Sequence, residues 1–109
     1  MVTVTFYRDS RNRLSSVFAE GHAGWADAGN DVVCAAASAI LQAAWLGLTD
    51  HAHVAIEGER MGGRLAMRWP EAERDRVDLQ AIVATAELAI IQIGRQYPQH
   101  VHARTAQEA

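Results

Sequence analysis

The sequence predicts an α+β fold of two layers, in which two helices cover a largely antiparallel sheet of four to five strands. Short segments at the start and in the middle of the chain alternate apolar and polar residues, as strands do, and two longer segments carry apolar residues at helical spacing. The predicted order is β-β-α-β-β-α, with room for a final strand. At 109 residues, the chain is long enough for one domain, which spans residues 1–109.

The first two strands are predicted to form a hairpin. Residues 2–7 alternate valine and phenylalanine with threonine and tyrosine, a composition that is typical of a strand. A polar turn follows at 9–12, and residues 13–20 are predicted to return alongside the first strand.

Two segments are predicted to be helical. Residues 32–48 are rich in alanine and apolar on almost every side, which predicts a helix with Asp31 as its N-cap. Such a helix is expected to be buried on most sides, against the sheet and also against a second helix or a partner subunit. The second helix is expected to begin at Asp78, a second candidate N-cap, and to continue to Tyr97, because apolar residues recur there at steps of three and four. Pro98 then ends it.

The remaining strands are predicted between and after the helices. Residues 52–57 alternate apolar and polar side chains and predict a third strand, and residues 64–69 predict a fourth, whose arginines are expected to face water. A short fifth strand is expected at 99–104, with a frayed end at 105–109.

Composition excludes several classes of protein. The ten basic residues, all arginine, are outnumbered by 13 acidic ones, which argues against direct nucleic acid binding through a strong positive field. One cysteine cannot form an intramolecular disulfide, and the first residues show no signal-peptide pattern. The longest weakly polar stretch, 32–48, is shorter than a bilayer span. We therefore expect a cytoplasmic protein without a membrane segment.

Cys34 is the strongest candidate for chemistry. It lies in the first turn of the predicted helix, where unpaired backbone N–H groups and the helix dipole favour a thiolate and can also stabilise an oxyanion. His22 stands twelve residues earlier, and the glycine-rich segment 21–30 can bend back to bring it to the sulfur as a base. The residues alone leave open the alternative that Cys34 is a small buried core residue.

Three polar residues near this pair are candidates for supporting roles. Asp31 and Asp27 are each placed to orient His22, although Asp31 is also a plain N-cap. Ser38 follows Cys34 by one helical turn and therefore lies on the same face, where it contacts the sulfur or the loop, or bonds the carbonyl of the preceding turn.

The loop between the second strand and the first helix contains Gly21, Gly24 and Gly29, which make it flexible. Trp25 lies in this loop, and its amphipathic ring is suited to cover an apolar groove and to move aside when substrate binds. We expect the loop to gate the site.

Two histidine pairs suggest a metal site as a further alternative. His51 and His53, like His100 and His102, have the spacing that puts both side chains on one side of a strand. The spacing matches no zinc signature, so we expect solvated residues and neither a metal nor another cofactor.

The segment that contains Cys34 resembles the signature of a known family, the ribosomal-processing cysteine protease Prp. The residues that carry this resemblance are Gly21-His22-Ala23-Gly24, the aromatic Trp25, Gly29, Asp31-Val32-Val33-Cys34-Ala35-Ala36, Ser38 and Ala39. The order of elements is similar over nearly the whole chain, and so is the pair Tyr97-Pro98 after the last helix. The chain departs from the family mildly, with Trp25 where tyrosine is common and Ala37 where valine is expected.

The resemblance implies a function. In that family the cysteine that matches Cys34 is the nucleophile and the histidine that matches His22 is its base, while Gly21, Asp31 and Ser38 also match the motif. The implied substrate is a short N-terminal extension of ribosomal protein L twenty-seven of the large subunit, which is removed during ribosome maturation, and the implied assembly is a homodimer.

We interpret the chain as a cytoplasmic cysteine endopeptidase with a Cys–His pair. Two alternatives remain open at this stage. One is a catalytically silent, ribosome-associated binding protein with a buried thiol. The other is a redox or metal-handling protein that uses Cys34 and the histidines.

Overall fold

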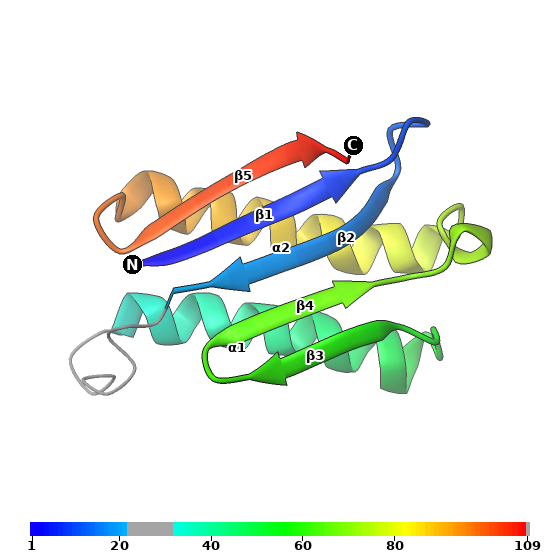
Figure 1. Ribbon diagram of the computed structural model, residues 1–109, viewed down its shortest axis with the longest axis horizontal. Helices are drawn as coiled ribbons and strands as arrows, with labels where there is room; N and C mark the ends of the chain where they lie inside the picture. The colour runs from blue at the N-terminus through cyan, green and yellow to red at the C-terminus, as the bar shows by residue number, and fades with distance from the viewer. Residues whose placement is uncertain (22–31, 109) are drawn as a thin grey trace.

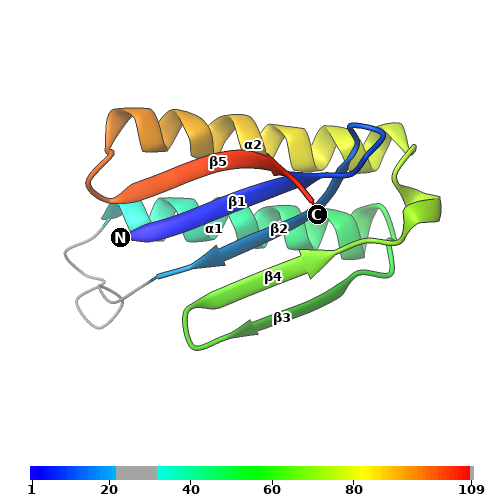
Figure 2. The ribbon, with the colours of Figure 1, turned by 45° about the horizontal axis from the view of Figure 1, so that its top comes forward.

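The computed structural model describes residues 1–21 and 32–108 and has two layers (Figure 1). One layer is a five-stranded sheet with the order β3-β4-β2-β1-β5. Two helices lie side by side on one face of this sheet (Figure 2). The bounds of the strands and helices are β1 (Val2–Arg8), β2 (Leu14–Glu20), α1 (Val32–Leu46), β3 (Glu57–Met61), β4 (Arg64–Arg68), α2 (Val77–Gln96) and β5 (Val101–Gln107). The predicted α+β class is confirmed.

The sheet is mixed, with a single parallel pair among its strands. β1 and β2 form the predicted antiparallel hairpin, with a bulge between Tyr7 and Arg8. β4 pairs antiparallel with both β2 and β3, while β5 runs parallel to β1, with Val101 opposite Val2. The parallel pairing needs a crossover, which α2 provides between β4 and β5. As a result, the start of β1 and the start of β5 lie at the same end of the sheet.

The core lies between the sheet and the helices. Alternate residues of β1, β2 and β4 face the helices, in agreement with the period of two in a strand. Trp69 closes one end of the core, because it is only 1% exposed and its indole N–H donates to the carbonyl of Leu14 at 2.7 Å. The largest fully buried side chains are Trp69, Phe6, Leu14, Leu48, Met67, Leu79, Ile90, Val4, Val17, Val83 and Val101.

The prediction of a third strand at residues 52–57 is wrong. Ala52 and Val54 are buried as the alternation indicated, but this segment has no strand partner, and His53 has a φ of 55°, which interrupts an extended conformation. The strand begins at Glu57 instead. All five residues of β3 are exposed, so the strand carries no apolar alternation.

The first helix differs from the prediction in its end and in its burial. The α-helix ends at Leu46, and a short π-helical turn, η2 (Gly47–His51), follows it. A face of α1 that points away from the sheet is exposed in the single chain. Burial on most sides is therefore not reached within one chain, and burial of this face against a partner subunit stays a prediction. A helix in a two-layer fold has only one side to bury against the sheet. The exposed residues of this face are Val32, Ala35, Ala36, Ala39, Ala43 and Leu46.

The second helix starts one residue before its predicted N-cap. α2 begins at Val77, Arg76 occupies the N-cap position, and no side chain caps the helix there. Asp78 lies inside the first turn, where its carboxylate accepts hydrogen bonds from Arg76 at 2.7 and 3.0 Å. The hydrogen bonding from Arg76 lowers the pKa of Asp78 from its ordinary value. The apolar face that the sequence predicted for this helix does pack on the sheet, through Leu79 and Ile90 among others.

The last strand is shifted towards the C-terminus. β5 starts at Val101, two residues after the predicted start, and continues to Gln107, so the predicted fraying from Thr105 is wrong there. Pairing with β1 explains the difference, since the backbone N–H of Glu108 still donates to the carbonyl of Arg8 at 2.9 Å.

Two described helical segments, 32–51 and 77–96, are long and apolar enough to cross a membrane by length and composition alone. The first is longer than the sequence predicted, because η2 continues α1 to His51. Core helices of soluble proteins pass the same test, and both segments carry residues of the core described above. The absence of membrane binding therefore stays a prediction.

Asp9 forms ion pairs at the β1–β2 turn, and we therefore expect the protein to lose stability in acid. Asp9 is buried and accepts hydrogen bonds from Arg13 and Arg74. Burial by itself raises the pKa of Asp9, but these bonds outweigh burial and hold the pKa well below the ordinary value of 3.8. The carboxylate therefore stabilises the fold above that value, and this contribution is lost as the pH falls below it.

We expect Asp9→Asn to be less stable than the wild type at neutral pH and to lose less stability on acidification. Urea unfolding at about pH 7 and about pH 3 measures both effects. If acidification lowers the unfolding free energy of both proteins equally, Asp9 is not the source of the loss of stability in acid.

Candidate active site

Cys34 is the third residue of α1 and lies in its first turn, as the sequence predicted. The backbone N–H groups of the first four residues of a helix have no partner inside the helix, so they surround this position with hydrogen-bond donors. The side chain is 6% exposed. This burial agrees with the alternative that Cys34 is a small core residue. The groups beside the thiol must therefore distinguish a core residue from a nucleophile.

The thiol is held where three segments of the chain meet. Its Sγ donates to the carbonyl oxygen of His100 at 3.6 Å, and the same oxygen accepts the backbone N–H of Val2 at 2.8 Å. The start of β1, the first turn of α1 and the turn before β5 therefore converge at Cys34. The parallel pairing of β1 with β5 creates this meeting point.

Gly21 follows the last residue of β2, at the same end of the sheet. Its φ of +92° lies in the left-handed region, and a Cβ atom built on it would stand 2.4 Å from the carbonyl oxygen of Met1. Only glycine fits here. The chain therefore leaves β2 in a fixed direction beside the start of β1, immediately before His22 in the sequence.

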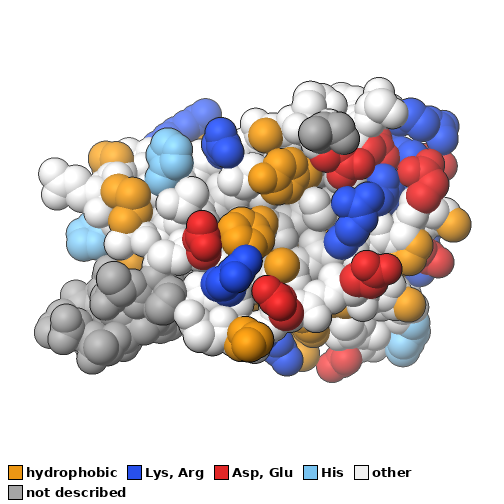
Figure 3. Space-filling view, viewed as in Figure 1, with side chains coloured by type: hydrophobic (Ala, Val, Ile, Leu, Met, Phe, Trp, Pro, Cys, Tyr) orange, Lys and Arg blue, Asp and Glu red, His pale blue; other side chains and the backbone are white. Residues whose placement is uncertain are grey.

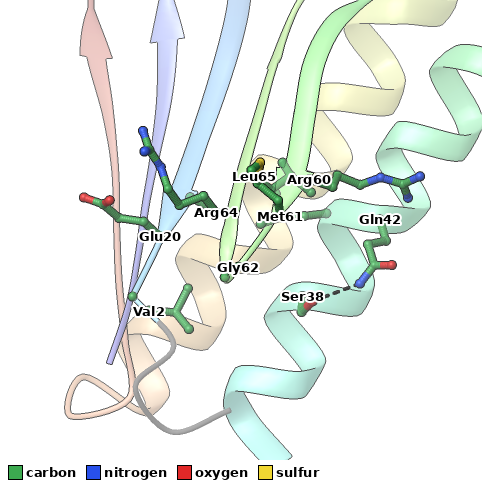
Figure 4. Close-up of a pocket in the computed structure, with 13 residues that line it drawn as sticks. Val2, Glu20, Ser38, Gln42, Arg60, Met61, Gly62, Arg64 and Leu65 are labelled. Carbon is green, nitrogen blue, oxygen red and sulfur yellow. Dashed lines mark hydrogen bonds between the residues drawn. The ribbon is translucent and has the colours of Figure 1, made fainter. Parts of the chain in front are cut away.

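A cavity of about 670 Å³ opens one helical turn beyond Cys34, between α1, the end of β2 and the β3–β4 hairpin (Figure 4). Its volume is typical of pockets that hold a small molecule or a few residues of a peptide. Apolar side chains form much of its lining. The described residues that line it are Val2, Ala19, Glu20, Gly21, Ser38, Leu41, Gln42, Arg60, Met61, Gly62, Gly63, Arg64 and Leu65.

Ser38 connects Cys34 to this cavity. Its hydroxyl oxygen accepts a hydrogen bond from the side-chain amide of Gln42 at 3.0 Å, and this bond differs from the contacts that the sequence suggested. Ser38 and Gln42 both line the cavity, and Cys34 precedes Ser38 by four residues, so all three lie along one side of α1.

The open face of the sheet carries charges of both signs, as the space-filling view shows (Figure 3). Arg64 and Arg68 are exposed there, which confirms the predicted water-facing arginines. Their cross-strand neighbours are Glu20 and Glu57, so positive and negative side chains face each other in adjacent strands.

The histidine pairs do not form a metal cluster within the part of the chain that the structure describes. No group of three or more metal-ligating side chains is found among residues 1–21 and 32–108. His51 belongs to η2 and His100 to the turn before β5, so neither lies in a strand as the spacing argument assumed. The two pairs also lie at opposite ends of α1, since His100 contacts Cys34 while η2 follows Leu46.

Several predicted site residues fall outside the described part of the chain. These residues are His22, Gly24, Trp25, Asp27, Gly29 and Asp31. The base, the orienting carboxylate, the N-cap and the gate therefore stay predictions.

Sequence reasoning missed the residues on the far side of the cavity. Met61 and Gly62 lie at the tip of the β3–β4 hairpin, and the pairing of β4 with β2 brings this tip to the site. His100 reaches Cys34 through the crossover of α2. Both placements depend on strand order, for which the sequence contains no local signal.

Comparisons with known proteins agree with this architecture. The family model described as "Cysteine protease Prp" matches residues 1–102. The ribosomal processing cysteine protease Prp of Staphylococcus aureus strain Mu50 is 29% identical over 104 residues, which cover 93% of this chain and 95% of that protein.

Two solved structures have the same fold. A protein from Streptococcus mutans has a TM-score of 0.81 and 25% identity, and the match covers 99% of this chain and 96% of that one. The Prp protease of S. aureus with a covalently linked product peptide has a TM-score of 0.84 and 23% identity, with 99% and 100% covered. Because the family model spans nearly the whole chain, this protein belongs to the cysteine protease Prp family and is a thiol peptidase.

Proposed function

We propose that this protease removes a short N-terminal extension from the precursor of ribosomal protein L twenty-seven during ribosome maturation in the cytoplasm. Cys34 is the nucleophile and His22 is its base. The observation that carries the proposal is the position of the one thiol of the chain, which stands in the first turn of α1 beside a peptide-sized cavity. The names of relatives support the substrate class, since two of them are called ribosomal processing proteases.

The proposed reaction has two steps. The Cys34 thiolate attacks the carbonyl carbon of the scissile bond, and the backbone N–H groups of the first helical turn donate to the oxygen as it gains negative charge. His22 takes the thiol proton and passes it to the departing amine as the C–N bond breaks. Water, deprotonated by His22, then attacks the thioester and releases the N-terminal fragment.

The direct experiment compares two substrates. Wild-type protein is incubated with the full precursor and with the same ribosomal protein made without its extension, and products are identified by mass spectrometry. We expect one cut in the precursor, at the end of the extension, and none in the shortened protein. An intact precursor after prolonged incubation would contradict the proposal and favour a catalytically silent binding protein.

We further propose that the protease acts as a homodimer. The outer faces of both helices expose large apolar side chains, among them Val32 at 74%, Val77 at 84% and Leu88 at 69%. The two helices lie side by side on one face of the sheet (Figure 2), and exposed apolar side chains on their outer sides favour self-association.

Sedimentation at micromolar concentration is expected to give a species of about twice 11.9 kDa. Leu88→Glu, which puts a charge on this surface, is expected to shift the population towards the monomer. A wild-type protein that sediments only as the monomer would contradict the homodimer.

A further inference from the structure

The turn between α2 and β5 passes beside the start of β1 (Figure 1) and reaches the first turn of α1. It begins at Tyr97, which is the C-cap of α2. The carbonyl oxygen of Tyr97 accepts the backbone N–H of His100 at 2.9 Å and that of Val101 at 3.1 Å. These two bonds close the turn. The direction of the His100 carbonyl is therefore set by the backbone and does not depend on a side chain.

The carbonyl oxygen of His100 accepts hydrogen bonds from two other segments. The backbone N–H of Val2 donates at 2.8 Å, and Sγ of Cys34 donates at 3.6 Å. A carbonyl oxygen has two lone pairs and can accept both bonds. Val2 is 6% exposed and lies opposite Val101 in the parallel register, so the sheet holds this donor in place. The acceptor beside the thiol is therefore fixed by strand pairing.

The contact with His100 selects the protonated form of the thiol. An S–H group donates to a carbonyl oxygen, whereas a thiolate has no hydrogen to donate and faces the negative end of the carbonyl dipole. The N–H groups in the first turn of α1 act in the opposite direction, since they favour the thiolate. The sulfur of Cys34 thus has one neighbour that stabilises the thiol and others that stabilise the thiolate.

The same contact keeps the sulfur away from a substrate. Cys34 is 6% exposed, and it does not itself line the described cavity, which begins one helical turn further along at Ser38. A sulfur that attacks a peptide bond must approach the carbonyl carbon to about 3–3.5 Å. In the described position the sulfur lies against a carbonyl of its own chain. It must therefore turn away from His100 before it can attack.

We propose that the backbone carbonyl of His100 holds Cys34 in a resting position, with the thiol protonated and turned into the core, until a peptide substrate binds. His100 is then a positioning residue that acts through its backbone. Before attack, the thiol leaves this carbonyl by rotation about the Cα–Cβ bond of Cys34. The S–H bond then breaks, its proton passes to the base proposed above, and its electron pair stays on the sulfur. This inference rests on the proposed protease function, in which Cys34 is the nucleophile.

The first measurement needs no variant. The chain contains one cysteine, so the S–H stretching band in the infrared spectrum of the wild-type protein belongs to Cys34 alone. At neutral pH we expect this band to be present and to lie below its frequency in a short unstructured cysteine peptide, because the S–H group donates to a carbonyl. A missing band would indicate a thiolate, and a band at the frequency of the peptide would indicate a thiol that donates no hydrogen bond. Either result overturns the proposal.

A matched pair of backbone substitutions then tests the effect on reactivity. Cell-free translation with an α-hydroxy acid replaces one backbone N–H by an ester oxygen, and the carbonyl before the ester becomes a weaker acceptor. An ester at Val101 weakens the carbonyl of His100 and removes the N–H that Val101 donates to Tyr97. An ester at His100 removes an N–H that is donated to the same oxygen of Tyr97, but it weakens the carbonyl of Gln99 instead. The second protein is therefore the control.

The ester at Val101 is expected to make the thiol of the empty enzyme more reactive. Below the midpoint of the pH profile, we expect alkylation by iodoacetamide to be about two- to fivefold faster, the range for weakening one hydrogen bond, and we expect the midpoint to move to lower pH. The ester at His100 should keep the wild-type profile. Thermal unfolding is measured in parallel, because a loosened structure would speed alkylation at every pH without moving the midpoint. Equal profiles in the two ester proteins overturn the proposal.

Cleavage assays separate failure of this inference from failure of the proposed function. If the precursor is not cut but the infrared and alkylation results are as expected, the proposed substrate is wrong and the resting position of Cys34 stands. With a cleaved precursor, we expect the ester at Val101 to lower KM and to leave kcat unchanged, because the thiol has already left His100 in the complex with substrate. A fall in kcat would show that this carbonyl is needed during attack, and would overturn its role in the resting enzyme.

Discussion

Cys34→Ala is expected to lower the cleavage rate by at least about a thousandfold, because no other residue in the chain supplies a thiol. The structure places this thiol in the first turn of α1, and alanine keeps the backbone N–H groups of that turn while it removes the thiol. The loss should therefore appear in kcat, with binding of the precursor nearly unchanged. Single-turnover cleavage and a separate binding titration measure the two quantities.

The control for this variant is a substitution that destabilises the fold at a distance from the site. Val83 is 1% exposed in the middle of α2, so Val83→Ala leaves a cavity in the core. We expect this variant to lose thermal stability and yet to cut the precursor at a temperature where it is folded. Cleavage by Cys34→Ala at a tenth of the wild-type rate would exclude Cys34 as the nucleophile.

Gly21→Ala is expected to have the second largest effect. The added Cβ would stand 2.4 Å from the backbone oxygen of Met1, and the residue would keep a φ of +92°. The strained backbone alone costs about 1–3 kcal/mol, and the clash with backbone adds to this because neither partner is a flexible side chain. We expect a fall in Tm of more than about 5 °C and a loss of cleavage, since the chain direction before His22 changes.

Gly62→Ala is the matched control for backbone strain without a clash. Gly62 has a φ of +54°, and an added Cβ would meet no atom within 4 Å. Its substitution should therefore cost less stability than that of Gly21. Equal losses of unfolding free energy in the two variants would show that the contact with Met1 does not matter.

Much of the fold was predictable because its signals are local. The alternation in β1 and the helical spacing from Leu79 to Ile93 each depend on residues that are near in sequence, and both elements form as predicted. The prediction of a third strand at residues 52–57 was wrong for a physical reason. Ala52 and Val54 are apolar because they pack into the core, and β3 is exposed because it is the edge of the sheet. Burial and strand pairing are separate properties here.

One part of the candidate site is predictable from local sequence, and the other part is not. The position of Cys34 in a first helical turn follows from the residues around it, and the structure agrees. The opposite wall of the cavity follows from the strand order β3-β4-β2, which brings Arg60 and Met61 to α1 from a distant part of the chain. No pattern within residues 57–63 indicates that partnership. The contact of Cys34 with His100 likewise depends on the crossover to β5.

The role of Cys34 as the nucleophile is tested by a titration of activity against alkylation of the single thiol. The protein is treated with increasing amounts of iodoacetamide, the labelled fraction is read from the intact mass, and cleavage of the precursor is measured for each sample. Because Cys34 is the one cysteine in the sequence, each label can be assigned to it without mapping. We predict that activity falls in direct proportion to the labelled fraction and reaches zero at one label per chain. Fully labelled protein that still cuts the precursor would show that Cys34 is not the nucleophile.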